Sequence, residues 1–238
     1  MSTNGFGPND EIHSFRRVRY LLDIIALVAV AFLLDLAVEI FVQWPRSLEA
    51  GLIFDALGKM LLVAIGWGLI RFRGERLADI GLKRPSSWGW TIATGIGLAA
   101  IIFIAIYASE KAGFHRTLSR FQSVQGDLHL TVVSVFYSFV GAGFYEEFMF
   151  RGFLMRGLAM LFGGGRYAWT AACIVQAVAF GALHSYQNPL GVLISGTIGI
   201  LLGFLVLRCR NLWAAIIAHG FYDAGRFVLF YFHGLPAA

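Results

Sequence analysis

The feature that most constrains the fold is a series of long apolar segments. A helix of about 20 apolar residues is long enough to cross the hydrocarbon core of a bilayer. The sequence predicts seven such spans, at residues 20–42, 49–71, 88–109, 129–150, 167–184, 190–208 and 211–232. A helix near 151–161, crossing the membrane or lying on its surface, would be an eighth. We therefore predict an all-α, polytopic membrane helix bundle with seven or eight transmembrane helices.

The composition is that of a chain solvated by a bilayer. Of its 238 residues, 58% are hydrophobic and only 14% are charged, whereas soluble domains contain roughly 45–50% apolar residues. The net charge of +5 comes from Lys and Arg residues that lie mostly in the short connectors. We interpret them as topology signals. The expected partners therefore include membrane lipids and no nucleic acid.

We expect a single integral membrane domain. Residues 1–15 are predicted to be a loose polar tail, residues 16–128 to hold the N-terminal transmembrane helices, and residues 129–238 to form the core with the chemistry. The first apolar stretch is too long for a cleaved signal peptide and is predicted to be an uncleaved span. The connectors on the N-terminal side carry 13 of the 19 Lys and Arg residues, which predicts a cytoplasmic N-terminus.

Ionisable residues at membrane depth are candidates for function because each costs on the order of 2.5–3.5 kcal/mol to insert. The first cluster of this kind is Glu146, Glu147 and Arg151. On an α-helix Glu147 and Arg151 are four residues apart and share a face, so we predict that they pair. Glu146 is turned about 100° away and is then the more exposed carboxylate, a candidate general base.

Two further clusters have the same four-residue spacing. Phe180 and His184 close the fifth predicted span, while His219 and Asp223 share a face of the last one, where the carboxylate could orient or charge the imidazole. If these helices pack together, the polar groups of all three clusters can meet in one wet cavity.

The spacing of the clusters supports this convergence in part. Glu146 lies 18 residues before Gly164 and His184 lies 20 residues after it, so a hairpin about that glycine sets both at similar depth. His219 lies nearer its own turn, and a tilted, broken or surface-lying segment at 151–161 would be needed to bring it level.

The patterns Glu-Glu-x-x-x-Arg, Phe-x-x-x-His and His-x-x-x-Asp, in this order and each in an apolar helix, resemble those of the CAAX-protease and bacteriocin-processing (CPBP, or Abi) family of intramembrane proteases. The resemblance covers about residues 130–230. It implies a prokaryotic-type endopeptidase that is a multi-pass protein of the plasma membrane. The implied substrate is a membrane-embedded or lipidated, CAAX-like peptide or protein.

The resemblance also implies a role for each motif residue. Glu146 would activate a water with help from His184, and Arg151 would hold Glu147. His219 and the residue at position 223 would stabilise the tetrahedral intermediate. Asp223 departs from the pattern, because many members have Asn there. An anion would bind a developing oxyanion poorly unless it were protonated or only oriented the histidine.

Other interpretations stay open at the level of the sequence. The same acid and histidine groups could serve a non-proteolytic membrane binding or transport protein, or a scaffold with a vestigial site. The expected mechanism needs no cofactor, but zinc held by Glu146, His184 and His219 is a chemically acceptable alternative. The remaining acids of the first two spans and a nearby lysine are interpreted as structural groups or as a polar lining: Asp23, Asp35, Glu39, Asp55 and Lys59.

Overall fold

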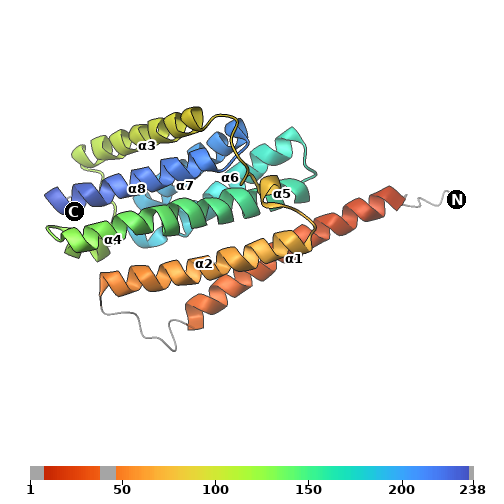
Figure 1. Ribbon diagram of the computed structural model, residues 1–238, viewed down its shortest axis with the longest axis horizontal. Coiled ribbons are helices and arrows are strands. Elements are labelled where there is room, and N and C mark those ends of the chain that lie inside the picture. Colours follow the sequence, from red (N-terminus) through yellow and green to blue (C-terminus); the bar gives the residue numbers. More distant parts are fainter. Residues whose placement is uncertain (1–7, 38–46, 236–238) are drawn as a thin grey trace.

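The computed structural model describes residues 8–37 and 47–235, and within these ranges the chain is helical, with no strand. The α-helices are α1 (Pro8–Ala37), α2 (Leu48–Phe72), α3 (Trp88–Lys111), α4 (Leu128–Tyr137), α5 (Met155–Leu161), α6 (Arg166–Ala182), α7 (Asn188–Cys209) and α8 (Trp213–His233). Two π-helical segments, η4 (Ser138–Phe144) and η5 (Glu147–Leu154), lie between α4 and α5. Short 3-10 turns, η2 (Leu77–Ile80), η3 (Ser119–Val124) and η6 (Ser185–Gln187), lie in the connectors. The helices form one bundle (Figure 1), which confirms the predicted all-α class.

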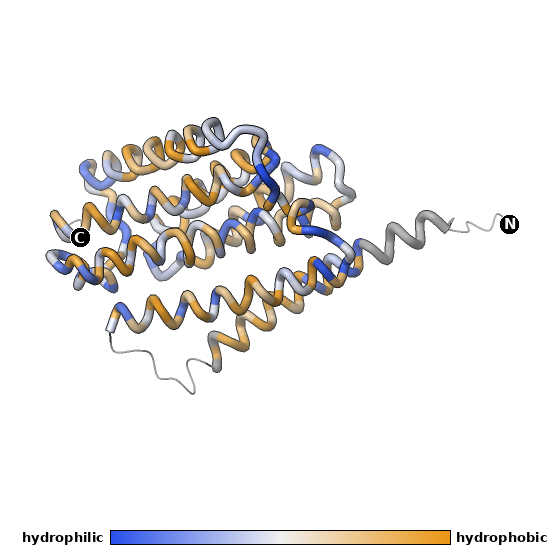
Figure 2. Tube along the Cα trace, in the orientation of Figure 1, coloured by the Kyte–Doolittle hydropathy of each residue, from blue (hydrophilic) through white to orange (hydrophobic). Residues whose placement is uncertain are grey.

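Four helical stretches of the described residues are long and apolar enough to cross a membrane: Leu48–Phe72, Trp88–Lys111, Leu128–Leu161 and Ser185–Cys209. Helices also occupy the other three predicted spans as far as these are described. They are not among the four, and α6, for example, has only 17 residues. Figure 2 shows hydrophobic residues along the helices and hydrophilic ones gathered in the connectors. These features are those of an integral membrane protein.

The segment Leu128–Leu161 is one helix of 34 residues. The predicted end near residue 150 is therefore wrong, and residues 151–161 continue this helix instead of forming an additional span or a surface helix. Arg151 and Arg156 interrupt the apolar run, but each has a carboxylate partner in the protein, at 2.9 Å and 3.0 Å, so they do not end the helix. Its π-helical segments lie on both sides of Glu146, and such segments are frequent at functional sites.

The helix ends follow the turn residues of the sequence, with one correction. Gly163 and Gly164 have φ of +102° and +75°, a conformation that glycine adopts readily, so the chain reverses there. Helix α7 begins at Asn188 with a proline in its first turn. Helix α1 begins at Pro8, inside the stretch predicted as a loose tail. Proline is favoured at a helix start because the N–H group that it lacks has no partner there.

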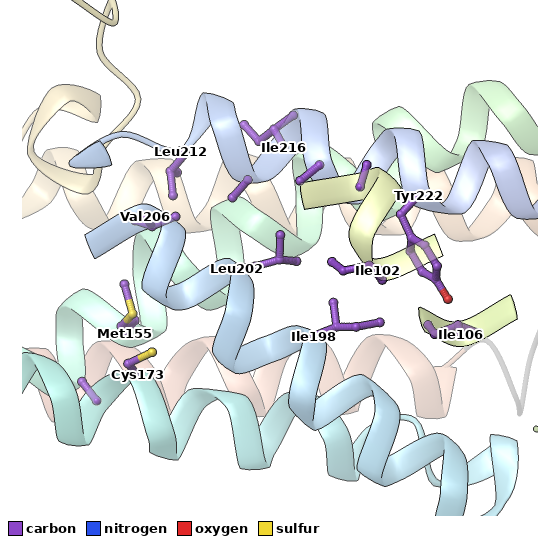
Figure 3. Close-up of a cluster of buried hydrophobic side chains, with 14 of the residues drawn as sticks. Ile102, Ile106, Met155, Cys173, Ile198, Leu202, Val206, Leu212, Ile216 and Tyr222 are labelled. Carbon is purple, nitrogen blue, oxygen red and sulfur yellow. The ribbon is translucent and has the colours of Figure 1, made fainter. Parts of the chain in front are cut away.

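The largest buried cluster lies between α3, α5, α6, α7 and α8. Figure 3 shows its labelled side chains: Ile102, Ile106, Met155, Cys173, Ile198, Leu202, Val206, Leu212, Ile216 and Tyr222. Glycines of α7 allow the helices to approach closely. A Cβ at Gly199 would lie 3.0 Å from Ala177 Cα, and one at Gly203 would lie 2.6 Å from Cys173 Sγ.

The Arg-rich end of the bundle, formed by residues 73–87, 162–166 and 208–212, is held by a polar network. Arg73 pairs with Asp23 of α1 at 2.7 Å and with Glu75 at 3.1 Å. Glu75 also accepts hydrogen bonds from Arg156 of α5, at 3.0 Å, and from Tyr20 of α1. Asp23 is thus structural, as predicted, and the network ties α1 and α5 to the end of α2.

Glu75 should make the stability of the protein sensitive to acid. Burial raises the pKa of Glu75, but hydrogen bonds from Arg156 and Tyr20 and the charges of Arg156 and Arg73 outweigh it, so the pKa lies below its usual value of 4.5. Stability gained in this way is present above the unfolded-state pKa and is lost as pH falls through the folded-state pKa. We expect the unfolding temperature in detergent to fall as the pH drops below 4.5.

The variant Glu75→Gln separates this contribution from general acid denaturation. It should be less stable at neutral pH by about 1–3 kcal/mol, because it leaves buried donors without a charged acceptor. Its unfolding temperature should also change less with acid than that of the wild type. Glu49→Gln is the control, because Glu49 and His129 form an exposed pair that contributes little. Equal acid sensitivity in wild type and Glu75→Gln would contradict the assignment.

Candidate active site

Glu147 is fully buried, and one of its oxygens joins two of the predicted clusters. Its Oε1 accepts a hydrogen bond from an Arg151 terminal nitrogen at 2.9 Å and lies 2.8 Å from His219 Nδ1. The predicted pair of Glu147 and Arg151 is therefore present, and it also reaches α8. Because the arginine stabilises the carboxylate, the carboxylate accepts and His219 Nδ1 carries the proton. The Nε2 atom of His219 is left to face the cavity.

His219 Nε2 lies between two further carboxylates. It is 3.8 Å from Glu146 Oε2 and 3.7 Å from Asp223 Oδ2. Both distances are longer than a direct hydrogen bond. Within the described part of the chain, Glu146 Oε2 is buried without a hydrogen-bond partner. The three groups thus surround a space that a water or a substrate oxygen can bridge.

His184 follows the end of α6, where its Nδ1 lies 2.7 Å from the carbonyl oxygen of Phe180. A carbonyl oxygen only accepts hydrogen bonds, so Nδ1 carries the proton and Nε2 of the neutral ring has a lone pair. The Phe180 ring packs against both imidazoles, with centroids 4.6 Å from that of His184 and 5.9 Å from that of His219. The Phe-x-x-x-His pattern therefore positions one histidine and spaces it from the other.

A close crossing of two helices brings the glutamates to His219. A Cβ at Gly143 in η4 would lie 2.9 Å from the Ile216 carbonyl oxygen and 3.2 Å from the Gly220 nitrogen of α8. Only glycine allows the backbones to approach so closely at this point. The spacing argument had left His219 too near its own turn. That difficulty disappears because the 128–161 helix continues past residue 150, which places Glu146 near its middle.

Lys59 of α2 belongs to the site, although its sequence context predicted only a structural group or part of a polar lining. Its Nζ lies 3.5 Å from Glu146 Oε1 and 3.0 Å from Asp55, and it donates to the Tyr137 hydroxyl at 2.7 Å. Tyr137 in turn donates to Asp55. The available signal was an Asp and a Lys four residues apart at membrane depth. Nothing local in the sequence indicated that they face Glu146. The side chain of Asp35 and residue Glu39 lie outside the described residues.

All three clusters contribute to one cavity of about 130 Å³, which lies toward the end of the bundle that holds η3 and η6. Its lining includes Glu146, His184, His219 and Asp223, together with Lys59. A larger cavity of about 850 Å³ shares Lys59, Glu146 and His184 and runs between α2 and α6. Glu147 and Arg151 do not line either cavity and lie behind His219.

The donor set has the right chemistry for zinc, which takes histidine nitrogen and carboxylate oxygen ligands. In the ranges that the structure describes, however, no three His, Cys, Asp or Glu side chains are arranged as a metal-binding group. Lys59 also places a cation 3.5 Å from Glu146 Oε1.

These features define a helical membrane protein with a buried carboxylate and histidine site. Residues 128–225 match the family described as type II CAAX prenyl endopeptidase Rce1-like. The match agrees with the resemblance seen in the motifs: residues 128–225 are similar to the CPBP/CAAX-protease family, which supports a peptide hydrolase at the general level. It spans all six predicted site residues, whereas Lys59 lies outside it. No curated protein and no solved structure matches the chain.

We expect Lys59 to act by positioning Glu146. Replacing it with Met should lower kcat of the peptidase reaction by about 10–100-fold, because a displaced catalytic group is costly to the rate, with little change in KM. Lys59→Arg keeps the charge and should keep most of the activity. Both variants should be assayed as folded protein, checked by thermal unfolding. Equal loss in the two variants would show that the charge on residue 59 does not matter.

Proposed function

We propose that the protein is an intramembrane endopeptidase that hydrolyses a peptide bond of a membrane-associated or lipidated, CAAX-like peptide or protein. The observation that carries the proposal is that Glu146, His184, His219 and Asp223 line one cavity, while buried Glu147 and Arg151 fix His219 from behind. The family match supports the reaction class. Within this proposal, residues 129–238 form the catalytic core and residues 16–128 supply the remaining helices.

The nucleophile is a water held between the Glu146 carboxylate and His184 Nε2. Lys59 lies beside one oxygen of Glu146, so the other, Oε2, is left to act as the base. As the water oxygen attacks the carbonyl carbon of the peptide, Glu146 takes up its proton. Phe180 holds His184 through its carbonyl, which keeps the lone pair of Nε2 directed at the water.

The negative charge of the tetrahedral intermediate develops on the former carbonyl oxygen. His219 in its protonated form donates from Nε2 to this oxygen, while Glu147 accepts from Nδ1 and stabilises the imidazolium. Donors that are fixed in advance in a water-poor site stabilise such a charge more strongly than water does. Asp223 lies on the same side of the ring and orients His219 or, if protonated, donates a hydrogen bond itself.

Collapse of the intermediate completes a balanced reaction. The carbon–nitrogen bond breaks, and Glu146 gives its proton to the leaving nitrogen. The products are a carboxylic acid and an amine, one water is consumed, and Glu146 returns to the carboxylate form. His219 loses no net proton over the cycle. The reaction needs no oxidant, reductant or second substrate.

The larger cavity suggests how a substrate arrives. It runs between α2 and α6 and is lined by apolar side chains such as Leu52, Phe150 and Leu183 beside the polar site residues. A membrane-embedded peptide can enter it laterally with its apolar or lipidated part still in the bilayer. We place the protein in a prokaryotic plasma membrane as a multi-pass protein. If the N-terminus is cytoplasmic, as the charge distribution predicts, the cavity opens toward the opposite side.

The proposal is tested with purified protein in liposomes and a library of quenched-fluorescent peptides that includes prenylated C-terminal peptides. Wild type should cleave members of the library. Glu146→Gln removes the base and His219→Ala removes the oxyanion donor, so each should lower kcat by about 10²–10⁴-fold. Unfolding temperatures near that of the wild type show that these losses are chemical and not structural.

A strong chelator is added in a parallel series. Cleavage that the chelator spares and both substitutions abolish would support a glutamate-activated water. Activity lost to the chelator and restored by zinc would overturn that mechanism in favour of a metal at Glu146, His184 and His219. No cleavage across the library by folded wild type would favour a binding or transport protein that uses the same groups.

Asp223 gives a separate prediction. If it orients His219 or acts as a hydrogen-bond donor, an amide can replace it, and Asp223→Asn should keep kcat within about tenfold of wild type. Asp223→Ala removes the polar group and should lower kcat by about 10²–10³-fold. Steady-state kinetics with a cleaved peptide from the library make the comparison. An Asn variant as inactive as the Ala variant would mean that the charge of Asp223 is required.

A further inference from the structure

A third cavity lies at the Arg-rich end of the bundle and shares only Arg151 with the site described above. It has a volume of about 520 Å³ and is formed by η2 and the connector after it, the 128–161 helix, α6 and α7. These segments are distant in the sequence and meet at one end of the bundle (Figure 1). Its lining carries one carboxylate, Asp79, and five cationic side chains: Lys83, Arg151, Arg156, Arg166 and Arg210.

The positive charge around this cavity is only partly balanced by the protein. Arg151 and Arg156 pair with carboxylates at 2.9 Å and 3.0 Å. Asp79 is engaged by the backbone N–H of Arg76 at 2.8 Å. Lys83, Arg166 and Arg210 have no carboxylate within ion-pair distance among residues 8–37 and 47–235. Three positive charges therefore surround the cavity without a counter-ion from the described chain.

Two unpartnered buried donors belong to arginines of the cavity lining and add to the charge count. The side chain of Arg151 is 1% exposed, yet its Nε–H has no hydrogen-bond partner in the described part of the molecule. Arg156 Nε is also buried without a partner there. Buried donors are nearly always satisfied, and an unsatisfied one calls for an explanation. A phosphate oxygen in the cavity is the kind of acceptor that guanidinium groups bind best.

The apolar side of the cavity suits the acyl part of a lipid. Trp169, Val206 and Leu207 form an apolar side next to the cations, and tryptophan favours the level of lipid headgroups. Arg210 follows the end of α7 with φ of +53°, a left-handed conformation that glycine usually supplies. The chain thus has a guanidinium at the rim of the cavity where a glycine would fit the backbone more easily.

We infer that this cavity binds a phosphate group, and that the phosphate is that of an anionic phospholipid whose headgroup contacts Arg166, Arg210 and Lys83. Basic pockets between membrane helices bind such headgroups elsewhere. Because Arg151 lines the cavity and also donates to Glu147, the bound phosphate lies one side chain away from the carboxylate that fixes His219. Binding itself does not depend on the proposed reaction.

The test is lipid retention by the full-length protein in detergent, measured by native mass spectrometry with phosphatidylglycerol or phosphatidylcholine added. Wild type should retain phosphatidylglycerol in preference to phosphatidylcholine. The double variant Arg166→Gln/Arg210→Gln should bind it at least about tenfold more weakly. The matched control is Arg84→Gln/Arg208→Gln, which removes two charges at the same end from exposed residues that do not line the cavity. It should bind like wild type.

Inorganic phosphate distinguishes the two sources of the anion. If it raises the unfolding temperature of wild type but not of Arg166→Gln/Arg210→Gln, and phosphatidylglycerol has no advantage over phosphatidylcholine, the site takes a soluble phosphate and the lipid part of the inference is overturned. Equal loss of phosphatidylglycerol in the control and the lining variant would overturn the site as a whole, because the effect would then be one of general surface charge. Unfolding temperatures establish that each variant is folded.

Discussion

The site depends on one buried carboxylate oxygen, Glu147 Oε1, that binds Arg151 and His219 at once. Removing an ion from water costs several kcal/mol, and only a well-formed pair with further hydrogen bonds repays it. Arg151 supplies the positive charge, and its second terminal nitrogen approaches the carbonyl oxygen of Gly199 in α7. The carboxylate can then fix the tautomer and orientation of His219. Without the pair of Glu147 and Arg151, a lone charge would be too costly to bury at the centre of the bundle. The His219 imidazole would then lose the contact that fixes its orientation.

The helices around this pair are braced by other polar contacts at depth. Arg226 of α8 binds Glu110 of α3 through two hydrogen bonds, of 2.8 Å and 2.6 Å. Arg116 donates to the Tyr222 hydroxyl at 3.0 Å. These contacts fix α8 about one and two turns beyond His219, on the helix face that carries the histidine. These charged side chains thus have partners, whereas Glu146 Oε2 has no hydrogen-bond partner among the described residues.

The sequence predicted features that depend on residues close together in the chain. The apolar runs predicted the helices because a bilayer fixes their length, and Gly163 and Gly164 marked the reversal between α5 and α6. The pairing of Glu147 with Arg151 followed from four-residue spacing on one helix. The predicted end of the long helix was wrong because Arg156 has a carboxylate partner from elsewhere, Glu75, which is 81 residues away. Contacts of this kind leave no periodic signal.

The contacts across helices were out of reach for the same reason. His219 and Glu147 are 72 residues apart, and Lys59 reaches Glu146 from a helix outside the family match. The three motifs predicted that polar stripes would meet, but not which atoms would face one another. The π-helical segments around Glu146 were also not predicted, because no residue type marks them. The relative depth of the site residues in the membrane was the weakest prediction, because it depends on where the 128–161 helix ends.

The most direct test of the central claim is a double-substitution cycle on kcat with Glu147→Gln, His219→Gln and the two combined, each measured on protein shown to be folded. If Glu147 acts on the reaction through His219, the two losses overlap, and the combined variant should be about as slow as His219→Gln alone. Losses that multiply in the combined variant would mean that the two residues act independently, and the account of a histidine fixed by a buried carboxylate would be contradicted.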